Sequence, residues 1–439
     1  MINAYDIAYS AVAVISAPVW LLFPRARKKV RRALETRLSR NLPVRPGANP
    51  AVLIHAVSLG EINATRTLVQ QLQSARPDLH LILSTTTETG HARALQLYSQ
   101  TPNTTILRFP LDLTPAITRT LDALRPDLVV LMELEVWPNF LHHCRKRHIP
   151  VIVINARLTP HSLKRYRLIR PIARRMFSRI SHVAAQDPAY ADQFISLGVP
   201  PAQVSVTGTM KFDTAEIATT VPGSSDLARD LYLNKGDTAP YFLLVAGSTG
   251  PGEEQPILAA YKQLLNEFPT LRLAIIPRHP ERFDEVANLI LESGFQLIRR
   301  SSSQQPVASS NPILLGDTMG ELRKFYSLAT IVLVGRTLVD LGPRQRGSDM
   351  IEPAALAKPI VVGPWTQNFA EPMNAFRAAD AIYELSNSTS LLSTLTEILR
   401  HPTPANEKAL RAQQTVRQNQ GATAQNVNII LEFLKNKWT

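Results

Sequence analysis

The sequence has little cysteine, with Cys144 as its single example in 439 residues. One cysteine excludes an internal disulfide and any metal cage built from several cysteines. Acidic residues are also outnumbered, because 48 Lys and Arg stand against 35 Asp and Glu and give a formal net charge of +13. This balance predicts an anionic partner, which is nucleic acid, an acidic membrane surface or a phosphorylated substrate.

The general nucleotide-binding signatures are absent. No GK[ST] follows a glycine-rich loop, which excludes a Walker loop, and there is no GxGxxG dinucleotide fingerprint. No second histidine or carboxylate stands at metal-ligand spacing from His279, so no metal site is expected. Aromatic residues make up 6% of the chain and do not interleave with the basic segments, which argues against a nucleic-acid partner.

A long uninterrupted apolar run is also missing, since residues 7–23 are apolar but contain Pro18. The basic segment 25–40 follows at once, with eight Lys or Arg against one acid. An apolar segment followed by positive charge predicts an uncleaved anchor, 1–46, on the cytoplasmic face of the inner membrane. It would either span the bilayer or lie on it, and the alternative is a hydrophobic helix packed on its domain. A second basic segment, 157–179, is either a solvated helix face or a surface for anionic lipid.

The chain is longer than the usual single-core domain, so two domains with a cleft between them are expected. Short apolar segments alternate with helical patterns, which predicts a parallel, doubly wound α/β sheet in each half. The domains are predicted at 47–213 and 241–420, joined by a linker at 214–240 and followed by a closing helix at 421–439. The expected strands are 51–56, 79–84, 104–109, 127–132, 150–154, 181–185 and 203–207, and then 241–246, 271–276, 295–299, 312–315, 329–334 and 358–362.

The segment IHAVSLGE, residues 54–61, passes from a buried strand into the start of a helix and places Glu61 in the first helical turn. A carboxylate there is expected to stay ionised, as either a general base or a simple complement to the helix dipole. In the second half, GSTGPGEE (residues 247–254) offers backbone N–H groups to an anion, and Arg278 follows the next strand and can bind a phosphate.

Eight strings in order resemble the Kdo transferases of lipopolysaccharide synthesis, which have the GT-B fold of two Rossmann-like domains. They cover almost the whole chain: HAVSLGE, MELEVWPN, NARLTPHSLKRYR, TGTMKFD, STGPGEE, PRHPERF, LLGDTMGEL and EPAALAKPIVVGP. The resemblance implies an inverting, metal-independent glycosyltransferase that moves 3-deoxy-D-manno-octulosonic acid (Kdo) from CMP-Kdo to a lipid A precursor, with no cofactor. The alternatives are a UDP-sugar transferase or epimerase, and a non-catalytic protein that binds anionic lipid.

The resemblance also implies roles for individual residues. Glu61 matches the general base, and Glu133 and Lys211 match residues that support the transition state. The positions that match the nucleotide site are Ser248, Arg278, His279, Met319, Gly320, Glu321, Asp349, Met350, Ile351 and Glu352.

The chain departs from the family pattern in the second half. GPRQRGSDMIEP replaces the usual GGHNPLEP, Gly335-Arg336 replaces Gly-Gly, and Gly250 stands where a histidine is common. Two arginines of the longer loop, Arg344 and Arg346, either contact phosphate or are solvated loop charges. The nucleotide is therefore not expected to be held here in quite the family's way.

Overall fold

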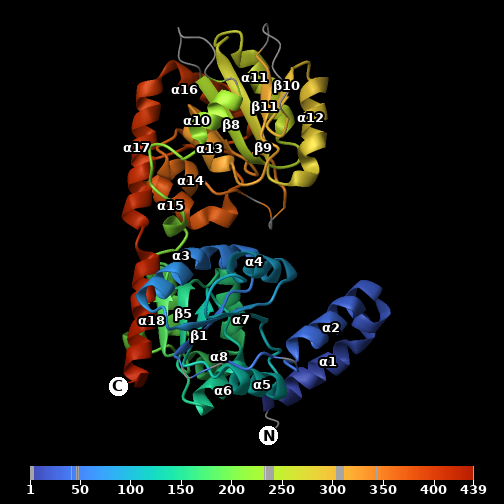
Figure 1. Cartoon of the computed structure of the whole chain (residues 1–439), viewed down its shortest axis with the longest axis vertical. Coiled ribbons are helices and arrows are strands. Elements are labelled where there is room, and N and C mark those ends of the chain that lie inside the picture. The colour runs from blue at the N-terminus through green and yellow to red at the C-terminus, as the bar shows by residue number, and fades with distance from the viewer. Residues whose placement is uncertain are drawn as a thin grey trace. The chain divides into compact units, whose positions relative to one another are not determined.

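The computed structural model describes residues 4–438 apart from 41, 46, 48, 232, 234–241, 303–310, 343–344 and 346. Arg344, Arg346 and much of the predicted linker lie outside the described residues. The chain divides into two compact units, Met1–Thr214 with Gln420–Thr439, and Ala215–Asn419. Each unit contains a seven-stranded sheet whose paired strands are all parallel (Figure 1).

The first sheet has the strand order β3-β2-β1-β4-β5-β6-β7. Its strands agree with those predicted from the sequence to within two residues at either end: β1 Ala51–His55, β2 His80–Thr85, β3 Thr104–Arg108, β4 Leu128–Met132, β5 Val151–Ala156, β6 His182–Ala185 and β7 Val204–Val206. Strand β1 lies inside the sheet, between β2 and β4, and its side chains are buried on both faces. Its continuous apolar run follows from this position.

The side chains of β1 alternate between two hydrophobic cores. Leu53 packs with residues of α5, α6 and α8, whereas Ile54 packs on the opposite face with residues of α3, α4 and α18. The result is a three-layer arrangement with helices on both faces of the sheet (Figure 1). The helices of this unit are α3 Leu59–Ala75, α4 Glu88–Tyr98, α5 Thr114–Leu124, α6 Pro138–Lys146, α7 Pro160–Leu168, α8 Arg170–Phe177, α9 Pro188–Ser196 and α18 Ala422–Trp438.

The closing helix α18 belongs to the first unit. The carboxylate of Asp213 accepts hydrogen bonds from the backbone N–H groups of Gly421, at 2.6 Å, and Thr423, at 2.5 Å. It therefore caps the start of α18 and fixes the point at which the chain re-enters this unit.

The second sheet has the order β10-β11-β9-β8-β12-β13-β14. The predicted strands are again confirmed, and one short strand, β14, was missed because two residues carry no periodic signal. The strands are β8 Phe242–Thr249, β9 Leu271–Pro277, β10 Leu297–Arg299, β11 Ile313–Leu315, β12 Ile331–Val334, β13 Ile360–Val362 and β14 Tyr383–Glu384. The helices are α10 Ser224–Asp230, α11 Glu254–Leu264, α12 Phe283–Glu292, α13 Leu322–Leu328, α14 Ile351–Ala355, α15 Ala370–Ala378, α16 Leu391–Arg400 and α17 Pro402–Asn419.

The segment predicted as a linker is partly built into the second unit. Helix α10 lies against α13, and Arg323 of α13 binds both the carboxylate and the carbonyl oxygen of Glu216, each at 2.7 Å. The described residues of 214–240 therefore pack on the second unit, beginning with Glu216, and do not form a free linker.

Two helices precede the first sheet and lie side by side (Figure 1), α1 Ala4–Leu22 and α2 Pro24–Arg37. The buried carboxylate of Asp6 fastens α1 to the first unit, because its Oδ1 accepts the Thr114 N–H at 2.7 Å and the Asn139 side-chain amide at 3.1 Å. Several apolar side chains of α1 remain exposed, among them Val14 and Ile15. Over the described residues, no helix combines the length and apolarity needed to cross a bilayer.

We expect Asp6→Ala to loosen the N-terminal helices, because two buried donors lose their acceptor at a cost of about 1–3 kcal/mol. Limited proteolysis should cut the α1–α2 segment faster in the variant, and the melting temperature should fall. Asp122→Ala is the matched control, since Asp122 makes an exposed pair with Arg147. Equal cleavage rates in both variants would show that Asp6 does not hold α1.

Candidate active site

Glu61 lies in the first turn of α3, directly after β1, and its carboxylate closes a capping box. The Ser58 side chain accepts the Glu61 N–H at 3.3 Å, while the Ser58 hydroxyl donates to Glu61 Oε1 at 2.8 Å. The Val57 N–H donates to Glu61 Oε2 at 2.9 Å. Each carboxylate oxygen thus receives one hydrogen bond and keeps a further lone pair that can accept a proton.

Three carboxylates of the first unit influence one another. Burial raises the pKa of Glu61 above its ordinary value and Glu133 raises it further, against the hydrogen bonds from Val57 and Ser58. Burial and the charges of Glu61 and Glu133 raise the pKa of Glu135 to about 7. From the helix dipole alone, Glu61 was expected to ionise easily. In the structure, partial burial and the negative charge of Glu133 outweigh the dipole and raise the pKa of Glu61. A carboxylate with a raised pKa is a stronger base.

Glu133 follows β4 directly and has a left-handed backbone, with φ of 57°. Its Oε2 pairs with Arg157 Nε at 2.8 Å, which links the ends of β4 and β5. Lys211 lies in the loop after β7, and the turn that follows it, Phe212–Thr214, contacts α3. The three residues implied as catalytic therefore share one unit, and Glu61 and Glu133 are electrostatically coupled.

A second group of residues lies at the carboxyl ends of β8, β9 and β12 in the other unit. The fully buried Glu253 organises this edge, because one carboxylate oxygen accepts the N–H groups of Gly250 and Arg336 and the other those of Thr337 and Leu338. The turn after β8 is thereby tied to the loop after β12. Four backbone donors also disperse the charge of this carboxylate.

Three predicted nucleotide-binding residues lie at the ends of β8 and β9. Ser248 is buried and has a left-handed φ of 59°. Arg278 and His279 are exposed, and the Arg278 N–H donates to the carbonyl of Thr249 at 3.0 Å. The Arg278 guanidinium is therefore held at the sheet edge with its head accessible to a ligand.

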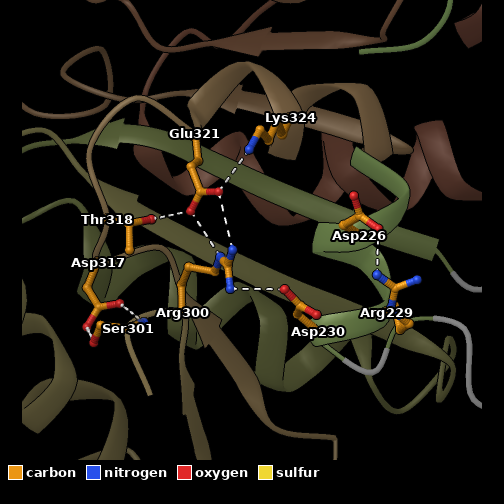
Figure 2. A network of polar contacts seen from close by, with 9 residues as sticks. All are labelled: Asp226, Arg229, Asp230, Arg300, Ser301, Asp317, Thr318, Glu321 and Lys324. Carbon is orange, nitrogen blue, oxygen red and sulfur yellow. Dashed lines mark hydrogen bonds and ion pairs between the residues drawn. The ribbon is translucent and has the colours of Figure 1, made fainter. Parts of the chain in front are cut away.

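Figure 2 shows that the Glu321 carboxylate is already engaged within the protein. It accepts hydrogen bonds from Arg300 Nε at 2.9 Å, Thr318 Oγ1 at 2.6 Å and Lys324 Nζ at 3.1 Å. Arg300 also reaches Asp230 of α10 at 3.3 Å. Although burial raises the pKa of Glu321, these partners lower it to about 2. The side chain therefore acts as a permanent anion that shapes the 316–321 turn.

The neighbouring residues of that turn are open to a ligand. Met319 is 69% exposed, and Gly320 has φ of 86° with no atom within 4 Å of the position of an added Cβ. The carboxylate network thus presents an exposed backbone turn, and it is this backbone that can meet a nucleotide.

The last predicted segment, 349–352, forms the start of α14. Asp349 Oδ1 accepts the Ile351 N–H at 2.8 Å, and the Met350 and Ile351 side chains are fully buried in the core. Only the backbone of these two residues is left to face a ligand. Burial, and then the charge of Asp349, raises the pKa of Glu352 to about 7.

Several residues of these two groups were given no role by the sequence. Glu135 of the MELEVWPN string is expected at a strand end where ligands collect, but its coupling to Glu61 depends on tertiary burial. For Glu253, the sequence shows only an acidic residue after a glycine turn. The residues around Arg300 give no indication that it belongs to a site. Among the described residues, no cluster of three or more His, Cys, Asp or Glu is arranged to hold a metal ion.

A curated protein of Haemophilus influenzae, described as 3-deoxy-D-manno-octulosonic acid transferase, is 32% identical to this chain over 97% of this chain and 98% of its own length. The chain belongs to the Kdo transferase family. It is a glycosyltransferase of lipopolysaccharide biosynthesis, and the identification made from the eight strings is confirmed.

Further comparisons agree with the Kdo transferase assignment. The family model described as 3-deoxy-D-manno-octulosonic-acid transferase matches residues 29–214. The Bordetella pertussis protein of the same description is 30% identical over 87% of each chain. The solved UDP-GlcNAc 2-epimerase of Neisseria meningitidis is similar in fold alone, with a TM-score of 0.55 and 17% identity over 88% of this chain and all of that one. Two parallel-sheet α/β domains of GT-B type are thereby confirmed.

Because the pKa of Glu352 is about 7, we expect pH-dependent affinity for the cytidine nucleotide that the resemblance assigns to this site. An ionised carboxylate can accept two ribose hydroxyl hydrogen bonds, so affinity for cytidine, which has no phosphate to titrate in this range, should rise by about tenfold between pH 6 and pH 8. Calorimetry on Glu352→Gln should show a flat profile. The exposed Glu292→Gln should keep the wild-type slope, and a sloping Glu352→Gln profile would contradict the assignment.

Proposed function

We propose that this Kdo transferase moves Kdo from CMP-Kdo to a hydroxyl of a lipid A precursor such as lipid IVA, with inversion and without a metal in the transfer step. The observation that carries the proposal is Glu61, a half-buried carboxylate fixed by two hydrogen bonds and made more basic by partial burial and by Glu133. Such a group is suited to accept the proton of an acceptor hydroxyl.

In the proposed reaction Glu61 takes the hydroxyl proton while the acceptor oxygen attacks the anomeric carbon of Kdo. General-base catalysis by a positioned carboxylate contributes about 100- to 10,000-fold to a rate. The carboxylate is held in place because Val57 and Ser58, the two residues just before α3, each donate a hydrogen bond to one of its oxygens. Attack on one face while CMP leaves from the other accounts for inversion.

The donor is assigned to the second unit. As the bond to CMP breaks, negative charge grows on the phosphate, and fixed donors at the strand ends stabilise it. The accessible guanidinium of Arg278 and the exposed turn at 318–320 supply such donors, and Glu352 supplies an acceptor for the ribose. Lys211 and Glu133 are assigned to support of the transition state in the first unit.

We also propose that the N-terminal helices rest on the cytoplasmic face of the inner membrane. The exposed side chains of α1 include Ile7, Val14, Ile15 and Leu22 at 64–77% exposure. Helix α2 is strongly basic, and the α7–α8 corner exposes Leu168 at 81% among further arginines. Exposed apolar groups beside positive charge favour anionic lipid, with each cation worth about 1 kcal/mol near the surface.

Glu61→Gln should lower kcat for Kdo transfer by about 100-fold or more. The glutamine oxygen can still accept the Val57 N–H, and its amide NH2 can donate to the Ser58 hydroxyl oxygen, so the melting temperature and the affinity for CMP should be almost unchanged. The product is measured by mass spectrometry after incubation with CMP-Kdo and a tetra-acylated, phosphorylated lipid A precursor.

Glu88→Gln serves as the control, because Glu88 lies in the first turn of α4 and pairs with Arg32 and Arg108 at the surface. Turnover retained by Glu61→Gln would refute the base assignment. Protection of the wild type against heat by UDP but not by CMP would instead favour a UDP-sugar enzyme.

Val14→Asp with Ile15→Asp should weaken binding to vesicles of phosphatidylglycerol and phosphatidylcholine by at least about tenfold, because two exposed apolar side chains no longer enter the interface. Flotation measures the bound fraction. Leu291→Asp with Leu410→Asp is the matched control, since these side chains are 54% and 59% exposed in the second unit. Equal loss in both double variants would contradict a membrane role for α1.

A further inference from the structure

Arg336 lies on the donor side of the second unit, two residues after the end of β12. In the sheet, β8 runs between β9 and β12, and Arg278 follows β9 directly. The two arginines therefore flank the carboxyl end of β8, where Ser248 and the glycine turn at 250–252 begin the loop to α11. Carboxyl ends of parallel strands are the usual location of ligands in such sheets.

The backbone of Arg336 is strained. Its φ is 62°, in the left-handed region that glycine adopts without penalty and arginine does not. The surroundings hold it there, because its N–H donates to Glu253 Oε2 at 2.5 Å and its carbonyl accepts the Gly347 N–H at 2.6 Å. Glycine would remove this strain, yet the chain has arginine here. The arginine side chain therefore has a function that offsets the strain.

The stem of the Arg336 side chain fills space beside the glycine turn. A Cβ added at Gly250 would lie 3.1 Å from Arg336 Cγ and 2.4 Å from Leu341 Cδ1. A larger residue at 250 would clash with Leu341 and would also force the Arg336 stem to shift by a few tenths of an ångström. Glycine at this position leaves room for the arginine to lie over the turn.

The Arg336 head group remains available for an anion. Its Nε donates to the Gln345 carbonyl at 3.0 Å, and the side chain is half-buried. Burial and then the charge of Arg278 lower the pKa of Arg336, so the two cations are close enough to repel each other. Within the described residues neither guanidinium pairs with a carboxylate, and Glu253 nearby is occupied by four backbone donors.

We propose that Arg336 is a second phosphate-binding residue beside Arg278, and that the two guanidinium groups together hold the nucleotide phosphate of the donor. The proposal rests on the assignment of CMP-Kdo as donor. A bound phosphate removes the repulsion between the arginines, and each guanidinium donates charge-assisted hydrogen bonds to its oxygens. Binding the departing phosphate also favours cleavage of its bond to Kdo.

Arg336→Gly tests this without endangering the fold, because glycine suits the left-handed backbone. Calorimetry should show affinity for CMP reduced by about tenfold or more, affinity for cytidine unchanged, and a melting temperature equal to or above that of the wild type. Arg336→Lys, which keeps the charge but loses the planar fork, should bind CMP between the two. Arg125→Gly is the matched control, since Arg125 is an exposed, left-handed residue with φ of 43° at the end of α5 in the first unit.

Wild-type affinity for CMP in Arg336→Gly would overturn the proposal, even where turnover with CMP-Kdo remains dependent on Glu61. A loss confined to CMP-Kdo, with CMP itself unaffected, would overturn it too, because the arginine would then bind the sugar carboxylate. Equal loss for cytidine and CMP would show a collapsed pocket and refute a phosphate role. If the wild type fails to bind CMP at all, the donor assignment falls and this inference falls with it.

Discussion

The parallel pairing of every strand is the constraint on which the rest of this protein depends. It places all the carboxyl ends of the strands in a sheet at one edge, so residues far apart in sequence gather there. The first unit uses its edge for carboxylates that share a desolvated environment. The second has arginines, fixed backbone N–H groups and the carboxylate of Glu352 at its edge. Two different sets of polar groups thus arise from the same architecture.

Residues with left-handed backbone angles lie at the carboxyl-end edge of both sheets. Glu133, Asn155, Ser248 and Arg336 all have left-handed backbones at or just after the ends of central strands. Each is held by fixed hydrogen bonds or tight packing of its neighbours, as the Glu253 carboxylate holds Arg336. Unfavourable dihedral angles at a ligand edge aim side chains and N–H groups in directions that ordinary strand geometry does not allow.

The fold could be predicted well because buried parallel strands leave a strong apolar pattern, and β1 is typical of this. The identities of the site residues came from the matching strings. Their electrostatics could not be predicted, since the raised pKa of Glu61 depends on burial and on Glu133, which stands 72 positions further along the chain. Glu321 shows the same limit. Its motif suggested a ligand contact, but Arg300 and Lys324 already bind its carboxylate. Lys324 stands only three residues further on, whereas Arg300 is distant in sequence and its pairing has no local signal.

The capping of α18 by Asp213 has a consequence for synthesis of the chain. The second unit is one continuous segment, whereas the first is completed only by residues from Gln420 onward. Val427, Ile430 and Leu434 of α18 cover one core of the first sheet. During vectorial synthesis that core face stays open until α18 has been made. The second unit can therefore fold first, and the first unit becomes complete only after α18 has left the ribosome.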